Sequence, residues 1–120
     1  GKMLKVAGGF HSPFMNEAAE NFSKVLESIE VGTPQITLYS NVTAQPYDGD
    51  VKELLAKQIV SPVRWQEIVE NMKTSGIDVM VEMGPGKTLT GLIKRIDPEV
   101  ERFNVEDVES LDAMASALAN

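Results

Sequence analysis

The residue best suited to acid–base chemistry in this sequence is His11, the only histidine of the chain. An imidazole changes its protonation near neutral pH, so it can take a proton from a nucleophile and return it to a leaving group. His11 lies between an apolar run and a helical pattern, which is where α/β proteins usually assemble their sites. Taken alone, a single histidine in a turn is more often a surface or capping residue. The neighbouring Ser12 does not complete a catalytic pair, because adjacent side chains diverge and a nucleophile must face the imidazole.

A second motif, EMGPGKT at residues 82–88, ends in Gly-Lys-Thr and invites comparison with the phosphate-binding P-loop. A P-loop needs a glycine five positions before Gly86, because successive backbone amides must wrap the phosphates. That position holds Val81, so the spacing argues against nucleotide hydrolysis. Two interpretations stay open: a tight turn from a strand into a helix, or an anion site at the N-terminus of that helix.

A third motif, QIVSPVRW at residues 58–65, contains Trp65, the only tryptophan. On an amphipathic helix, Trp65 is typical of a core or domain-packing residue, and Gln58 is typical of a solvated or capping one. The many carboxylates show no spacing that suggests glycosidase or metal chemistry. With one histidine and no cysteine, we expect no transition-metal site.

The elements that position these motifs alternate between strand and helix patterns. Strands are expected at residues 4–10, 36–42, 78–83 and 101–105, the third of them buried and parallel. Helices are expected at residues 13–29, 51–59, 64–75, 87–95 and 110–118. The expected N-caps are Ser12, Asp50 and Ser110, the expected stop is Gly76, and Leu89, Leu92 and Ile93 are expected to face inward. This order predicts an α/β fold with parallel strands and crossover helices.

Composition narrows the class of protein. The chain has 120 residues, of which 42% are hydrophobic, so it is the size of one small domain. Its net charge of -7 disfavours nonspecific binding to nucleic acid. The absence of cysteine excludes disulfides and favours a cytoplasmic location. No apolar run approaches the roughly 20 residues of a membrane helix, so no membrane association is expected.

Four segments, in this order, resemble the malonyl-CoA:acyl-carrier-protein transacylases and the acyltransferase domains of polyketide and fatty-acid synthases. They are residues 9–15 (GFHSPFM), 40–42 (SNV), 58–65 and 82–95. The resemblance extends over nearly the whole chain and implies the C-terminal portion of such an enzyme. The implied fold is a partial α/β-hydrolase-like acyltransferase core. Residues 1–10 would be the last strand of a ferredoxin-like small subdomain, and residues 11–120 would belong to the large subdomain.

The resemblance implies roles for particular residues. His11 matches the catalytic histidine, which activates a serine nucleophile and later the thiol of the carrier protein. Gln58 matches the residue whose backbone carbonyl orients that histidine, so its own side chain is expected to matter little. Asn41 matches a supporting asparagine. Phe10 matches a position that is commonly phenylalanine in members that take malonyl and often serine in those that take methylmalonyl, a contact that discriminates by about 1–3 kcal/mol.

Two further residues, Lys94 and Arg95, match basic positions proposed to face the acidic carrier protein. On an acidic chain such a pair would steer orientation more than it sets affinity. The implied partners are therefore acyl carrier protein and malonyl-CoA, with the coenzyme A thioester as substrate and no cofactor.

The sequence departs from the family in one respect, because it contains no Gly-x-Ser-x-Gly. The serine, its oxyanion-hole amides and the family arginine for the malonyl carboxylate are therefore expected on an absent N-terminal portion, which becomes a further partner. The chain alone is predicted to be inactive, to expose apolar edges and either to associate or to be only partly ordered. The alternatives to an acyltransferase segment are a noncatalytic module that binds acyl carrier protein and an unrelated phosphate-binding domain built on residues 84–88.

Overall fold

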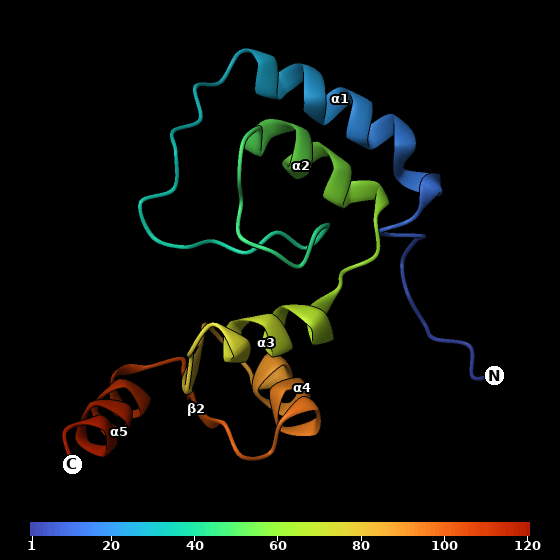
Figure 1. Cartoon of the computed structure of the whole chain (residues 1–120). Coiled ribbons are helices and arrows are strands. Elements are labelled where there is room, and N and C mark those ends of the chain that lie inside the picture. Colours follow the sequence, from blue (N-terminus) through green and yellow to red (C-terminus); the bar gives the residue numbers. More distant parts are fainter. The chain divides into compact units, whose positions relative to one another are not determined.

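The computed structural model describes all 120 residues, which divide into two compact units, Gly1–Ile68 and Val69–Asn120 (Figure 1). The boundary falls inside helix α3 (Trp65–Thr74). The first unit consists of helices joined by long irregular connections, and the second contains the strands. No helix combines the length and the apolar character that crossing a membrane requires.

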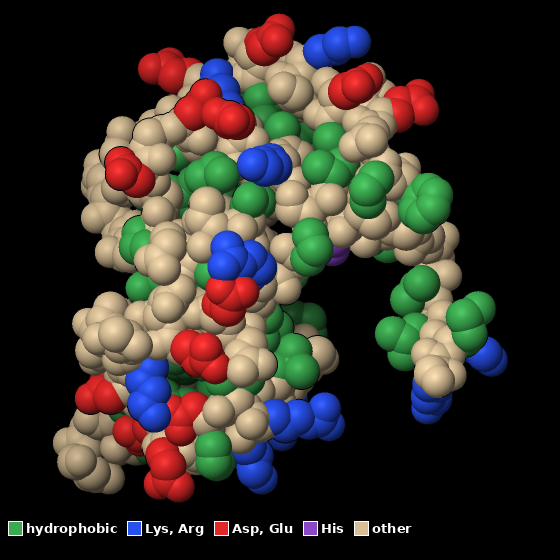
Figure 2. Space-filling model, turned by 45° about the vertical axis from the view of Figure 1, so that its right-hand side comes forward, with side chains coloured by type: hydrophobic (Ala, Val, Ile, Leu, Met, Phe, Trp, Pro, Cys, Tyr) green, Lys and Arg blue, Asp and Glu red, His purple; other side chains and the backbone are tan.

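The N-terminal residues form neither helix nor strand, so the prediction of a strand at residues 4–10 is wrong. Residues 1–11 are all exposed, and apolar side chains such as Met3, 94% exposed, lie open at the surface (Figure 2). A strand is stable only when its N–H and C=O groups pair with those of a neighbour. No β-bridge joins this segment to any other part of the chain.

The first helix begins as a short 3-10 turn, Pro13–Met15, and continues as α1 (Asn16–Glu27). Pro13 takes the first helical position as expected, where its missing N–H costs no hydrogen bond. The expectation that Ser12 caps the helix with its side chain is wrong. Its hydroxyl donates instead to the carbonyl of Gly9, which ties the helix start to the preceding turn.

The expected strand at residues 36–42 is also wrong, apart from a single antiparallel bridge between Tyr39 and Pro46. The chain turns back on itself here, and the N–H of Ala44 donates to the carbonyl of Ser40 at 2.9 Å. Both residues are completely buried. The turn therefore uses the backbone groups that a strand would offer to a neighbour, which a propensity for strand cannot reveal.

The next helix, α2 (Val51–Lys57), begins where predicted. The expected cap is confirmed, because Oδ1 of Asp50 accepts the N–H of Glu53 at 3.1 Å. The helix ends two residues earlier than predicted and tightens into a 3-10 turn, Gln58–Val60. Helix α3 then stops as predicted at Gly76, which has a φ of +104° that favours glycine.

The second unit is built on two parallel strands, β1 (Val79–Met83) and β2 (Glu101–Val105), joined through helix α4 (Thr88–Ile96). Their register pairs Val79 with Glu101 and Met83 with Val105. Strand β2 begins and ends where the sequence predicted. The parallel pair with its crossover helix gives a partial α/β fold, as expected.

Fewer side chains of this unit are buried than the sequence predicted. Met80 and Ile93 are buried, but Met83 is 72% exposed, so the prediction of a fully buried β1 is wrong. Ile93 faces inward as expected, whereas Leu89 and Leu92 are more than a third exposed. A sheet of two strands is too narrow to cover the whole apolar face of α4, which is why only one of these three side chains is buried.

The last helix, α5 (Val108–Leu118), begins two residues earlier than predicted, so Ser110 is not its cap. The cap is Asp107, whose carboxylate accepts the N–H of Ser110 at 2.7 Å. The Ser110 hydroxyl in turn lies 3.1 Å from the N–H of Asp107, which completes a capping box. Hydrogen bonds from the side chain and backbone of Ser110 hold the pKa of Asp107 below its ordinary value.

Candidate active site

His11 projects from a tight turn that its neighbours fix. Its φ of +57° lies in the left-handed region, which residues other than glycine enter at an energetic cost. Gly9 allows the close approach, because a Cβ there would lie only 2.9 Å from Cδ2 of Phe14. The Ser12 hydroxyl holds the carbonyl of Gly9, and the Ser12 carbonyl accepts the N–H of Met15 at 3.0 Å. The local sequence therefore determines the direction in which the exposed imidazole leaves the backbone.

The imidazole reaches across the first unit to Gln58, where Nδ1 of His11 lies 2.9 Å from the backbone carbonyl oxygen. In an α-helix this oxygen would accept the N–H of the residue four positions later. That residue is Pro62, which has no N–H, so the carbonyl keeps acceptor capacity. The N–H of Ser61 also reaches it, at 3.4 Å. Because a carbonyl only accepts, this contact places the proton of the neutral ring on Nδ1 and leaves the lone pair on Nε2.

The side chain of Gln58 has a partner of its own. Nδ2 of Asn41 donates to Oε1 of Gln58 at 3.3 Å, and both residues are half-buried. The structure thus brings together His11, Asn41 and Gln58 from three separate segments of the first unit. The Gln58 carboxamide, which the resemblance left without a role, connects the carbonyl that His11 contacts to the loop at residues 40–45.

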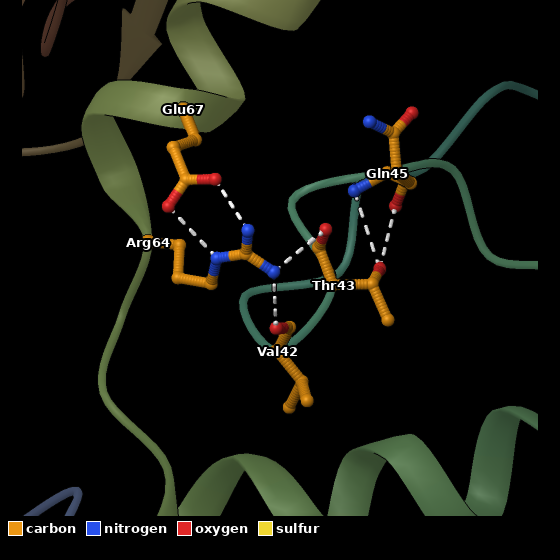
Figure 3. Close-up of polar contacts among 5 residues, drawn as sticks. All are labelled: Val42, Thr43, Gln45, Arg64 and Glu67. Carbon is orange, nitrogen blue, oxygen red and sulfur yellow. Dashed lines mark hydrogen bonds and ion pairs between the residues drawn. The ribbon is translucent and has the colours of Figure 1, made fainter.

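Arg64 binds that loop (Figure 3). Its Nη1 donates to the carbonyl oxygens of Val42 at 3.2 Å and Thr43 at 3.1 Å, and its backbone N–H donates to the carbonyl of Asn41 at 3.3 Å. Glu67 accepts hydrogen bonds from Nε at 2.9 Å and from Nη2 of the same guanidinium. These bonds hold the pKa of Glu67 below its ordinary value and raise the pKa of Arg64.

Neither member of this ion pair was predicted to belong to the site. The spacing of Arg64 and Glu67, three residues apart at the start of a helix, indicates a local pair. The two carbonyls that the guanidinium binds lie 21 and 22 residues earlier, in a loop. No pattern in the sequence points to them, because backbone acceptors carry no residue signature.

The resemblance also implies roles for three other residues. Phe10 precedes His11 and is 58% exposed. Lys94 and Arg95 belong to the second unit, where both are exposed in the last turn of α4. Positive charge at that end of a helix complements the helix dipole.

The turn between β1 and α4 has the geometry of a tight strand-to-helix connection. Gly84 and Gly86 have φ values of +127° and +93°, which favour glycine. Glu82 accepts the N–H groups of Leu89 at 3.2 Å and Thr90 at 2.8 Å, together with the Thr90 hydroxyl at 2.6 Å. The Thr90 bonds hold the pKa of Glu82 below its ordinary value.

These contacts argue against an anion site at residues 82–88. The amides at the start of α4 are already paired with Glu82, and the N–H of Gly86 donates to Oε2 of Glu106 at 2.9 Å. Two carboxylates therefore occupy the place where a phosphate would bind and would repel it. No group of three histidine, cysteine or acidic side chains is arranged to hold a metal ion.

Comparison with known proteins gives a consistent result. No family model matches the chain. It is 39% identical over 117 residues to the malonyl CoA-acyl carrier protein transacylase of Haemophilus influenzae, a match that covers 96% of this chain and 38% of that protein. The crystal structure of the transacylase of the same name from Clostridium perfringens superposes with a TM-score of 0.93 at 36% identity, covering 97% of this chain and 37% of that one.

A third similar protein was solved with a partner. It is a malonyl-transacylase in complex with its type II polyketide acyl-carrier protein, and it superposes with a TM-score of 0.89 at 35% identity, covering 95% of this chain and 38% of that one. The chain thus spans little more than a third of the length of the relatives it matches.

Proposed function

The chain belongs to the malonyl CoA-acyl carrier protein transacylase family, of whose members it spans a part, and on this premise we propose that it supplies the general base of malonyl transfer. The reaction moves malonyl from coenzyme A to the phosphopantetheine thiol of an acyl carrier protein, for fatty acid or polyketide biosynthesis. The chain serves as the C-terminal part of the enzyme. The serine nucleophile lies outside these 120 residues, which contain no Gly-x-Ser-x-Gly.

His11 acts in both halves of a ping-pong reaction. In the first, Nε2 takes the proton of the serine hydroxyl as its oxygen attacks the malonyl thioester, and the imidazolium then protonates the departing coenzyme A thiolate. In the second, Nε2 takes the proton of the carrier-protein thiol as it attacks the malonyl-serine ester, and the serine oxygen recovers a proton. The observation that supports this role is the contact of Nδ1 with the Gln58 carbonyl, because it leaves Nε2 able to accept.

The other residues serve substrate and partner. Asn41 supports the site through Gln58, and Phe10 narrows the space beside the malonyl C2 atom, which disfavours a methyl branch there. Lys94 and Arg95 face the acidic carrier protein, and their exposure on α4 supports that role. Residues 1–10 complete a strand of a ferredoxin-like small subdomain once the rest of the fold supplies its neighbour.

The test uses a full-length transacylase in which this chain replaces the corresponding segment. His11→Ala should lower the rate of malonyl transfer to acyl carrier protein by a factor on the order of 10² to 10⁴, the usual contribution of a positioned base. Glu20→Ala, an exposed position on α1, is the control and should leave the rate unchanged. The chain without the remainder of the enzyme should transfer nothing. Undiminished transfer by His11→Ala would exclude the proposal.

A further inference from the structure

We propose that Arg64 and Glu67 are positioning residues for His11, which they hold in its base-competent form through the loop at residues 40–45 and through Gln58. The inference rests on the proposed function for its consequence in catalysis. Its structural content, a path of contacts from Glu67 to the imidazole, stands within the first unit.

The path begins with a loop that is part of no helix and no sheet. Residues 40–45 belong to no strand or helix, and Ala44 holds a left-handed φ of +58°. The carbonyls of Val42 and Thr43 point at one guanidinium nitrogen, while the Thr43 hydroxyl is engaged with the backbone of Gln45 (Figure 3). The positive charge of Arg64 therefore holds two consecutive carbonyls of this loop in place.

Glu67 determines where that charge lies. Its two carboxylate oxygens accept from Nε and Nη2 of Arg64, which leaves Nη1 directed at the loop. This two-point contact uses the planar fork of arginine, a geometry that the single ammonium of lysine cannot reproduce. Glu67 thus acts only through Arg64, and it contacts neither the loop nor His11 in the structure.

The loop transmits its position to His11 through two amide groups. Asn41 is held by the backbone N–H of Arg64 and donates with its own carboxamide to that of Gln58. The backbone carbonyl of Gln58 is the acceptor for His11. Release of residues 41–43 would remove the side-chain anchor of Gln58, so its carbonyl would no longer be held at the distance that selects the Nδ1-protonated ring.

The single histidine makes the first experiment direct, because nitrogen-15 labelling of histidine gives the two ring signals of His11 alone. In the unaltered 120-residue chain, we expect the neutral ring to occupy one form, with the proton on Nδ1. Arg64→Met should shift both signals toward the average of the two tautomers. Arg64→Lys should restore part of the difference, and Glu67→Gln should give a smaller shift than Arg64→Met.

The chain offers a matched control in its second unit. Nη1 of Arg102 also donates to two backbone carbonyls, those of Pro98 and Val100, both at 3.1 Å. Arg102→Met removes the same chemical group from an equivalent contact and should leave the His11 signals unchanged. The double variant Arg64→Met with Glu67→Gln should shift the signals no further than Arg64→Met alone, since Glu67 acts through Arg64.

Two outcomes would overturn the inference. One is that Arg64→Met leaves the His11 signals as in the unaltered chain. The other is that Arg102→Met shifts them equally, which would report a general loss of order. If Arg64→Met does not fold, as judged by the dispersion of its amide spectrum, Glu67→Gln decides: signals that do not move from those of the unaltered chain reject the proposal.

A second measurement separates this inference from the proposed function. In the full-length transacylase, Arg64→Met should lower kcat about tenfold to a hundredfold with little change in KM, because a small displacement of a reacting group carries a cost of that order. An inactive His11→Ala with a fully active Arg64→Met would reject the positioning role alone. An active His11→Ala would reject the proposed function. The positioning role of Arg64 would then be decided by the nuclear magnetic resonance measurement alone.

Discussion

Two irregular segments of this molecule are held by side chains of opposite charge. The loop at residues 40–45 has carbonyl oxygens without regular partners, and a guanidinium, that of Arg64, binds two of them. The turn before α4 has amide hydrogens without partners, as every helix N-terminus does, and the carboxylates of Glu82 and Glu106 bind them. The charge of the side chain thus depends on the backbone group that it binds: a cation binds carbonyls, and a carboxylate binds amides. The loop held by the cation connects to His11 through Asn41 and Gln58.

The two segments also differ in what surrounds them. The turn before α4 joins a hydrogen-bonded pair of strands to a helix, so its carboxylates add to a framework that the backbone ladder already fixes. The loop at residues 40–45 is closed by two backbone hydrogen bonds, from Ser40 to Gln45 and from Ala44 to Ser40, and has one bridge beside it, between Tyr39 and Pro46. Side chains therefore carry more of the order in the loop than in the turn. Four experiments test how the two regions are held.

The largest effect should come from the buried side chain of α4. Ile93 is the buried residue of α4, and Ile93→Ala should lower the free energy of unfolding by about 2–5 kcal/mol, the usual cost of removing a buried aliphatic side chain. Urea denaturation followed by circular dichroism would measure it. Leu92→Ala, at a position that is 37% exposed, is the control and should cost clearly less. Equal losses for the two variants would show that α4 does not rely on the observed face.

A smaller effect should come from the carboxylate at the turn. Glu82→Ala removes the acceptor for the N–H groups of Leu89 and Thr90, so hydrogen exchange of these two amides should accelerate about tenfold, as for the loss of a helix cap. Amides of the loop at residues 40–45 should exchange as before. Glu106→Ala should affect the amide of Gly86 in the same way. Unchanged protection of Leu89 and Thr90 would mean that the backbone framework alone holds the helix start.

The smallest effect should come from acid. The pKa of Glu82 is lowered by hydrogen bonds from Thr90, so its stabilising contribution is complete above the ordinary glutamate value of about 4.3. That contribution is lost as the pH falls from there through the lowered pKa, when the folded state must take up the proton. The melting temperature should therefore fall over this range, and it should fall less in Glu82→Gln. A Glu82→Gln variant as sensitive to acid as the unaltered chain would assign the loss to other groups.

The same acid should affect the loop less than the turn. The pKa of Glu67 is lowered by its hydrogen bonds with Arg64, so protonation of Glu67 would release one side of the guanidinium. The bonds from Arg64 to the carbonyls of Val42 and Thr43 involve no group that titrates in this range. Amide exchange measured across both segments at falling pH would separate the two responses.

The fold was predictable where an element carries its partners nearby in the sequence. Strand β2 and the caps at Asp50 and Gly76 follow from local patterns, and the structure has them where expected. The expected strands at residues 4–10 and 36–42 failed because a β-branched or apolar run says nothing about whether a neighbouring strand exists. The cap of α5 was misplaced because Ser110 does take part in capping, from the third helical position rather than from the N-cap position, which Asp107 holds.

The candidate site was predictable as far as the resemblance named its residues, including the backbone carbonyl of Gln58. The resemblance named His11, Asn41 and Gln58, and in the structure His11 and Asn41 each contact Gln58. Arg64 was missed because its partners are backbone carbonyls of a loop that the sequence predicted to be a strand. Contacts between a side chain and a distant backbone group leave no spacing to detect.

Pro62 determines how this site would respond to a systematic substitution scan. Every residue has a backbone carbonyl, so no replacement of Gln58 can delete the acceptor that His11 contacts. A substitution at position 62, by contrast, would add an N–H that competes for it. The residue that keeps the carbonyl oxygen of Gln58 available to His11 is thus Pro62, four positions later. A scan would therefore detect the side chain of Gln58, through its contact with Asn41, and Pro62, but never the carbonyl itself.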